Sequence, residues 1–223
     1  MPSPLFPTAT VDLLHVALGL IIITNLSLLG AERHRMCIRL IALQGLMLGL
    51  LPFFATREPV DLHLLGVGVI FIGIKGVILP WLLRRTYLQL PTQGARSPYV
   101  GYSICVLLGL AGLSVSIWLG AQLGISANPL FSVFFPIGLS TVIAGILLIV
   151  TRREALAQVF GYLVMENGIY LMGVPMAQQS LVWLELSVLL DILVAAFVMG
   201  IAIHHIHRAF ESTDLDKIAS LRD

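Results

Sequence analysis

Residues 66–85 read GVGVIFIGIKGVILPWLLRR, and this stretch decides what kind of fold the chain adopts. A helix needs roughly 20 mostly apolar residues to cross a lipid bilayer. The stretch has that length, ends in two arginines and holds one further charged side chain, Lys75, near its middle. It therefore predicts a membrane-spanning helix, over residues 62–83, with a basic group deep in the bilayer.

The composition of the whole chain also indicates a membrane protein. Of its 223 residues, 58% are hydrophobic and 11% are charged, whereas a soluble domain carries about 25% charged residues. Long apolar runs favour helices over a β-barrel. A net charge of +1 gives no reason to expect a nucleic-acid partner, and two cysteines are too few for an iron–sulfur cluster or a structural zinc site. We expect an all-α integral membrane protein without a cofactor or metal.

Polar residues and Pro/Gly breaks divide the chain into seven candidate spans. They are approximately residues 10–30, 37–55, 62–83, 99–121, 129–150, 154–174 and 180–204. Basic loops are held on the cytoplasmic side of a membrane, and 11 of the 13 Lys and Arg residues fall in alternate loops and in the C-terminal tail. This alternation predicts seven transmembrane helices, an outside N-terminus and a cytoplasmic C-terminus.

Lys75 is the first of several polar side chains that fall inside these spans. Charge at that depth costs several kcal/mol unless it is paired, protonated or hydrated. Gly73 and Gly76 flank the lysine and Pro80 follows it, which suits close helix packing or a hydrated pocket. Snorkelling to the membrane surface and a static ion pair are the alternatives.

Acidic and amide side chains lie at similar depth. Glu166 is near the middle of the sixth span and Asp191 near the centre of the seventh. Glu185 is closer to the outer end of the seventh span, where solvation at the interface explains it equally well. Gln44, in the second span, either extends a hydrogen-bonded chain or bonds a neighbouring helix. Because hydrocarbon disfavours the charged form of acids and bases alike, such groups can exchange protons. We predict a proton relay of Glu166, Asp191, Glu185, Lys75 and Gln44.

The layout of these polar helices repeats. Residues 1–98 and 129–207 each hold three spans in the same orientation, in which a basic loop precedes two helices that carry buried polar groups. Residues 99–128 hold an uncharged span, interpreted as a spacer helix with an outer loop, and residues 208–223 form a cytoplasmic tail. Transporters are often built from such repeats.

The C-terminal part, from about residue 130 to 223, resembles the small K-type membrane subunit of respiratory complex I and the small subunits of Mrp-type cation/proton antiporters. The resemblance is carried by the RRE loop at 152–154, the glutamate in GYLVMENGIYL, the acid in the next span, and the basic helix end before TDLDKIASLRD. With GIKGVILPWLLRR and its additional N-terminal helices, the whole chain resembles the hydrogenase-4 component E family. Members of that family are membrane-arm subunits of group 4 nickel–iron hydrogenases and related respiratory complexes.

This resemblance implies roles for particular residues. Glu166 corresponds to the second-helix glutamate of the K-type subunit. The next carboxylate of that subunit matches less cleanly, because Asp191 stands where a glutamate is expected and Glu185 is its rival. The resemblance also implies antiporter-like and other membrane subunits as partners, and the inner membrane of a bacterium as the location.

We therefore expect a non-redox membrane subunit of a proton-translocating complex, in which Glu166 and Asp191 carry protons and Lys75 is their electrostatic partner. Two alternatives stay open. A structural adaptor would pair its buried charges statically, without a proton path, and a small stand-alone ion transporter would work without partners. An active site of its own is not expected, because the sequence contains no nucleophile–base pair, metal site or nucleotide loop.

Overall fold

The computed structural model describes residues 8–55, 62–89, 98–123 and 129–177, together with the single residues 189, 192, 193, 196 and 200. Nearly all of these residues are helical, and no strand occurs among them. Four helical segments are long and apolar enough to cross a membrane: Leu13–Gly30, His34–Leu51, Tyr102–Gln122 and Leu130–Thr151. The described part of the chain is thus all-α and of the multi-pass membrane type.

The helices coincide with the first six predicted spans. In chain order they are α1 (Thr8–Gly30), α2 (His34–Ala55), α3 (Leu62–Ile72), the π-helix η1 (Gly73–Ile78), α4 (Leu79–Gln89), α5 (Tyr102–Gln122), α6 (Pro129–Thr151) and α7 (Ala155–Ala177). The third span is divided into α3, η1 and α4, which follow one another directly and have 11, 6 and 11 residues. Each of the three pieces is therefore shorter than a membrane span on its own.

The seventh predicted span lies largely outside the described residues. Only five of its residues are described, at positions 189, 192, 193, 196 and 200, and these are helical and exposed. The seven-helix count and the arrangement in two repeats therefore stay predictions.

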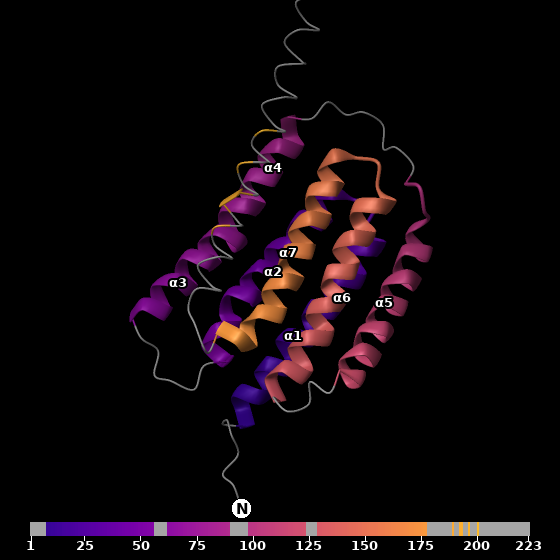
Figure 1. The fold of residues 1–223 in the computed structure, drawn as a ribbon. Coiled ribbons are helices and arrows are strands. Elements are labelled where there is room, and N and C mark those ends of the chain that lie inside the picture. Colours follow the sequence, from indigo (N-terminus) through magenta and orange to yellow (C-terminus); the bar gives the residue numbers. More distant parts are fainter. Residues whose placement is uncertain are drawn as a thin grey trace, which may run out of the picture.

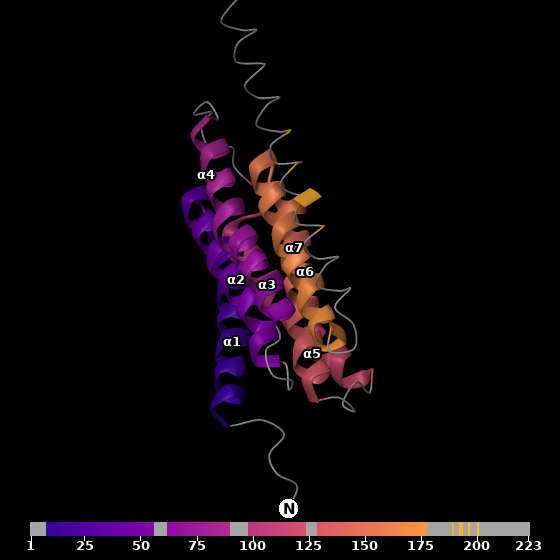
Figure 2. The same ribbon diagram turned by 90° about the vertical axis from the view of Figure 1, so that its left-hand side faces the viewer.

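The helices form two layers, which the two ribbon views show from directions 90° apart (Figure 1, Figure 2). One layer holds α1 and α2, with the rod of α3, η1 and α4 packed on α2. The other layer holds α5, α6 and α7 in that order. Between the layers, α1 packs on α5 and α6, and α2 packs on α7. The polar residues of α2 and α7 are therefore directed to the same interior.

Glycines bring α6 and α7 together backbone to backbone. A Cβ atom built on Gly145 would lie 2.6 Å from the carbonyl oxygen of Gly161. One built on Gly168 would lie 2.6 Å from the carbonyl oxygen of Gly138. No real side chain approaches a backbone atom so closely, so only glycine fits at these contacts. Small residues are the usual means by which membrane helices pack tightly.

Lys75 lies in the π-helix η1. Pro80 has no N–H for the carbonyl four residues before it, and its ring crowds that carbonyl. The preceding turn widens instead, and the N–H of Leu79 donates to the carbonyl oxygen of Ile74, five residues back. η1 packs closely on α2, because a Cβ atom on Gly45 would lie 2.6 Å from the carbonyl oxygen of Lys75.

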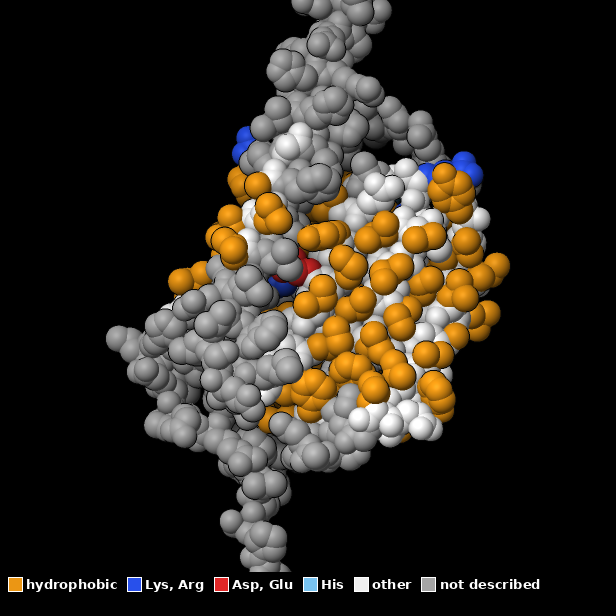
Figure 3. Space-filling view, viewed as in Figure 1, with side chains coloured by type: hydrophobic (Ala, Val, Ile, Leu, Met, Phe, Trp, Pro, Cys, Tyr) orange, Lys and Arg blue, Asp and Glu red, His pale blue; other side chains and the backbone are white. Residues whose placement is uncertain are grey.

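The described basic loops meet at one end of the bundle. Arg152, between α6 and α7, donates from Nη2 to the carbonyl oxygen of Leu29 at 2.9 Å, and its guanidinium lies 4.2 Å from the ring centre of Tyr102. His34, at the start of α2, pairs with Glu154, just before α7. Figure 3 shows basic side chains on both sides of this end. The arrangement agrees with the alternation of basic loops in the sequence; that this end is cytoplasmic stays a prediction.

Candidate functional site

A layer of polar side chains divides the hydrophobic core into two apolar halves. In α1, Ile21 belongs to one half and Leu28 to the other; in α2, Leu48 and Ile41 divide in the same way. The buried polar side chains that fall between the two halves in sequence are Thr24, Asn25, Gln44, Lys75, Ser140, Thr141, Glu166 and Asn167. Each of the central helices therefore contributes polar atoms at a similar depth.

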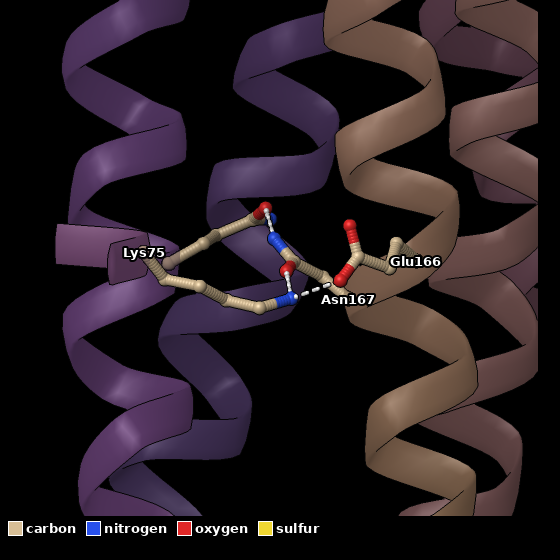
Figure 4. A network of polar contacts seen from close by, with 4 residues as sticks. Lys75, Glu166 and Asn167 are labelled. Atoms are coloured by element: carbon tan, nitrogen blue, oxygen red, sulfur yellow. Dashed lines mark hydrogen bonds and ion pairs between the residues drawn. The ribbon is translucent and has the colours of Figure 1, made fainter. Parts of the chain in front are cut away.

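The centre of this polar layer is an ion pair between the two layers of helices. Lys75 Nζ lies 2.9 Å from Glu166 Oε1 and donates to Asn167 Oδ1, also at 2.9 Å. The side chains of Lys75 and Glu166 are 3% and 1% exposed. Figure 4 shows the lysine reaching from η1 across to α7. Figure 3 shows an acidic and a basic side chain next to each other at mid-height of the bundle.

The surroundings of the lysine explain how a charge is held at this depth. A buried ion pair offsets more of the loss of hydration when its geometry is close and further polar groups bond to it. The Lys75 ammonium meets a carboxylate oxygen and an amide oxygen, and it also faces the rings of Phe71 and Tyr170 at 5.1 and 5.9 Å. The lysine therefore pairs inside the protein and does not snorkel to the membrane surface.

A chain of side-chain amides continues from the ion pair into the opposite layer. Asn167 Nδ2 donates to Gln44 Oε1 at 3.3 Å, a contact that Figure 4 shows beside the ion pair. Gln44 Nε2 donates to Asn25 Oδ1 at 2.7 Å and to Thr24 Oγ1 at 3.0 Å. Asn25 Nδ2 then donates to Thr141 Oγ1 at 2.8 Å. The hydrogen bonds therefore run from η1 through α7, α2 and α1 to α6.

Backbone carbonyls end the chain on both branches. The Thr24 hydroxyl donates to the carbonyl oxygen of Ile21 at 2.8 Å, and the Thr141 hydroxyl donates to that of Ile137 at 2.7 Å. Buried polar groups are costly when they lack a partner. In this layer the two hydroxyls satisfy the amides and are themselves satisfied by their own helices.

Glu166 keeps one oxygen outside these contacts. Oε1 accepts from Lys75, whereas Oε2 is buried and has no hydrogen-bond partner among the described residues. A proton can therefore be added at Oε2 without displacing the lysine from Oε1.

Three of the five residues predicted for a relay are brought together in the layer: Lys75, Glu166 and Gln44. The other two, Asp191 and Glu185, lie outside the described residues. Among the residues that the structure describes, no three His, Cys, Asp or Glu side chains come together as metal ligands would.

Four further residues take part in the hydrogen bonds of the layer, although no role was predicted for them from the sequence. Asn167 is the direct partner of Lys75, and Thr24, Asn25 and Thr141 form the far end of the chain. A signal for them exists in the sequence. Each lies near the depth at which a neighbouring span carries a charge or an amide, so a search for polar residues at matched depth would have found them.

Comparisons with known proteins show similarity to one family model and to relatives of nearly the same length. Residues 133–223 match the family described as NADH-ubiquinone/plastoquinone oxidoreductase chain 4L. A protein of Mycobacterium tuberculosis, described as uncharacterized, is 27% identical over 95% of this chain and 96% of its own. Hydrogenase-4 component E of Escherichia coli strain K12 is 23% identical over 92% of this chain and 94% of its own. No solved structure matches.

The predicted resemblance is thereby confirmed. The chain is similar to hydrogenase-4 component E over nearly its whole length, and its C-terminal part is similar to the complex I chain 4L family. The matched range divides the polar layer. It includes Glu166, Asn167 and Thr141, whereas the cation Lys75 and the amide Gln44 come from the N-terminal helices outside the match.

Proposed function

We propose that this chain is a non-redox membrane-arm subunit of a multisubunit respiratory complex of the hydrogenase or complex I type, and that it contributes a buried proton relay. The similarities to hydrogenase-4 component E and to oxidoreductase chain 4L support the assignment to such a complex. Its partners are antiporter-like and other membrane subunits. It resides in the cytoplasmic membrane of a bacterium, with the basic end of the bundle in the cytoplasm.

One observation carries the proton relay: the buried ion pair of Lys75 and Glu166. Two charges in the middle of a membrane helix bundle are expensive to place there. Well-packed apolar side chains would hold the helices together as well or better. The presence of a titratable pair at this depth is therefore better explained by a use for its charge than by adhesion between helices.

In the proposed relay Glu166 carries the proton and Lys75 is its switchable partner. When a proton binds at Oε2, the carboxylate becomes neutral and the lysine loses its counter-charge. In a low-dielectric core the charge of one group strongly affects the other. Charge movements in neighbouring subunits, driven by electron transfer there, would bias this equilibrium and move the proton onward. Asp191 and Glu185, of the predicted seventh span, are the next carriers.

The subunit assignment is tested by identifying the proteins that co-purify with this chain. The tagged full-length chain is extracted from its native membrane in mild detergent, and co-purifying proteins are identified by mass spectrometry. We expect antiporter-like membrane subunits and a metal-bearing peripheral arm. A protein that stays alone, or associates only with itself, through repeated mild extractions would overturn the assignment. Transport by the reconstituted single chain would then favour the stand-alone transporter.

The relay is tested in the assembled complex by Glu166→Gln. Glutamine keeps the size of the side chain but cannot ionise, so we expect electron transfer to continue while proton uptake into inverted membrane vesicles falls to background. The electron donor follows from the composition of the purified complex. Glu32→Gln, at an exposed acid between α1 and α2, is the matched control and should leave proton uptake unchanged. Normal proton uptake by an assembled Glu166→Gln complex would contradict the proposed relay.

A structural adaptor is the second candidate. One observation favours it, namely that the amide groups of Asn167, Gln44 and Asn25 are bonded from end to end. Such a layer can act as a static clamp between the two layers of helices. Under this reading the buried charges only neutralise each other, and removing both together would leave proton translocation unchanged.

A further inference from the structure

The hydrogen bonds of the polar layer all point in one direction. Starting from Lys75, each group accepts from the one before it and donates to the one after it. The order is Lys75, Asn167, Gln44, Asn25, Thr141 and the carbonyl of Ile137, with a side branch from Gln44 to Thr24. None of the three amides in this series donates toward the lysine.

The charge on Lys75 imposes this direction. An ammonium group has three donors and no acceptor, so Asn167 must present its oxygen to Nζ. Its NH₂ group then faces Gln44, which must accept through its oxygen. Gln44 in turn donates through its NH₂ group, so Asn25 must also accept through its oxygen. The direction of a chain that ends on another helix is thus fixed by a single proton on the lysine.

The opposite direction is equally complete. If each amide rotates by half a turn, Asn167 donates to Lys75 and accepts from Gln44, and Gln44 accepts from Asn25. The hydroxyls of Thr24 and Thr141 then donate to the amides and leave the carbonyls of their own helices, which still accept from the helical N–H groups. The terminal torsions of Asn and Gln are broad and nearly two-fold, so neither direction strains the side chains.

We propose that Asn167, Gln44 and Asn25 form a two-state chain of positioning residues that reverses when a net proton leaves the Lys75–Glu166 pair. A neutral lysine amine has two N–H donors and one lone pair. If Glu166 is ionised and its two oxygens Oε1 and Oε2 take both N–H groups, the lone pair is left for an N–H of Asn167. The three amides then reverse their hydrogen bonds together, and the reversal extends to the contact between α1 and α6.

Transfer of a proton within the pair does not reverse the chain. When the proton moves from Lys75 Nζ to Glu166, one N–H bond breaks and one O–H bond forms. The new O–H donates to the lysine lone pair, and Lys75 still donates to Asn167. The direction of the amide hydrogen bonds therefore changes when a proton leaves the site, but not when a proton only moves from Lys75 to Glu166. Tyr170, whose ring faces Lys75 at 5.9 Å, is a further titratable group beside the pair.

This inference deepens the proposed function, because a relay needs its neighbouring helices to respond to each departing proton. It gives Gln44 a role different from that of a proton carrier. Side-chain amides donate and accept hydrogen bonds but do not ionise in the ordinary pH range. Gln44 thus transmits the direction of hydrogen bonding, and the proton itself passes through Glu166.

The sequence makes the test simple. The chain contains two lysines, Lys75 and Lys217, and three asparagines, Asn25, Asn128 and Asn167. The full-length chain, labelled with ¹⁵N on the lysine and asparagine side chains and placed in lipid nanodiscs, gives few signals in solid-state NMR. Lys217→Arg, Asn128→Ser and Asn25→Ser assign them by loss. Raising the pH until the Lys75 signal changes from ammonium to amine should shift both Asn167 and Asn25 at the same pH.

Gln44→Met then separates transmission through the chain from a direct effect of charge. In this variant Asn167 should still follow Lys75, whereas the shift of Asn25 should disappear. Gln44→Glu, which keeps the size but removes the amide donor, serves if the methionine variant does not fold, and it should likewise remove the shift. Asn128 is the internal control and should not follow Lys75 in any variant.

Three results would overturn the two-state chain: Asn25 unmoved when Lys75 loses its proton, Asn25 moving equally without Gln44, or Lys75 remaining an ammonium to the alkaline limit of the folded protein. All are measured on the isolated chain. A failure here is therefore distinguishable from a failure of the subunit assignment, which is decided by co-purification.

Discussion

Lys75 and Glu166 are almost completely withdrawn from solvent, with 3% and 1% of their side chains exposed. Each has lost its hydration, and the attraction between them at 2.9 Å offsets that loss. Removal of one partner leaves the other as an uncompensated charge in the core. Removal of both partners leaves no buried charge, so the cost of desolvating the two charges is removed as well. The pair should therefore behave non-additively when it is mutated.

The first prediction follows from this asymmetry. Lys75→Met or Glu166→Gln alone should lower the free energy of unfolding by about 3–5 kcal/mol. The double variant Lys75→Met/Glu166→Gln should recover most of that loss. Unfolding of the purified chain by sodium dodecyl sulfate, followed by circular dichroism, measures all three. Losses that simply add in the double variant would contradict a mutually compensating pair.

The far end of the amide chain supports a second prediction. Thr141→Val should cost about 1–3 kcal/mol, because it leaves the NH₂ group of Asn25 buried without its acceptor. Thr86→Val is a closely matched control. Thr86 is also buried and also donates to a carbonyl four residues back, that of Leu82, so its replacement should cost less. Equal costs in the same unfolding experiment would show that the bond from Asn25 adds nothing.

Single residues could be predicted from sequence only in part. A charge inside an apolar span is visible in one dimension, and so Lys75 and Glu166 stand out. Their pairing is not visible, because it depends on how far each helix is rotated about its axis and on which helices are neighbours. Asn25 is less visible, because an uncharged amide in an apolar span stands out only when its depth is compared with that of the charges in the other spans.

At the scale of helices, the contact between α6 and α7 supports a third prediction. Gly161 faces Gly145 so closely that an added Cβ atom would lie 2.6 Å from its carbonyl oxygen. Gly161→Ala should therefore force the two helices apart and destabilise the fold by more than the usual 1–3 kcal/mol of an overpacked core site. Gly173→Ala, in the same helix with no atom within 4 Å of the added Cβ, is the control and should be neutral or stabilising.

The outcome of that pair of variants also bears on the site. Gly161 and Glu166 lie on the same helix, so a displaced α7 would move the carboxylate away from Lys75. The Lys75 ¹⁵N signal should change in Gly161→Ala and stay as in the wild type in Gly173→Ala. A destabilised Gly161→Ala protein with an unchanged lysine signal would show that the packing of α7 and the ion pair are independent.

Helices were the part of the structure most easily predicted from sequence. Apolar runs of membrane-spanning length leave little choice, because a backbone in lipid must satisfy its own hydrogen bonds. The π-helix η1 could not be predicted in detail. Pro80 indicates a disturbance in the third span, but the widened turn that places Lys75 toward α7 also depends on how that span packs against α2.

At the scale of the whole molecule, the polar layer joins two parts with different similarity to known proteins. Residues 133–223, which match oxidoreductase chain 4L, supply the carboxylate, and the N-terminal helices supply the cation. The arrangement of these parts in two layers was not evident from sequence, where the same helices were interpreted as two repeats. Contacts between distant segments, such as α2 with α7, are not specified by the apolar runs alone.

The last prediction decides between a relay and a clamp in the assembled complex. The double variant Lys75→Met/Glu166→Gln removes both charges and, by the argument above, retains most of the stability of the fold. The complex should therefore assemble and transfer electrons. A relay loses its proton carrier and translocates no protons per electron, whereas a clamp retains its packing and translocates normally. The ratio of proton uptake to electron transfer in inverted vesicles measures the difference. Because the fold is preserved, a ratio near zero cannot be attributed to unfolding, and a wild-type ratio would assign the ion pair to structure alone.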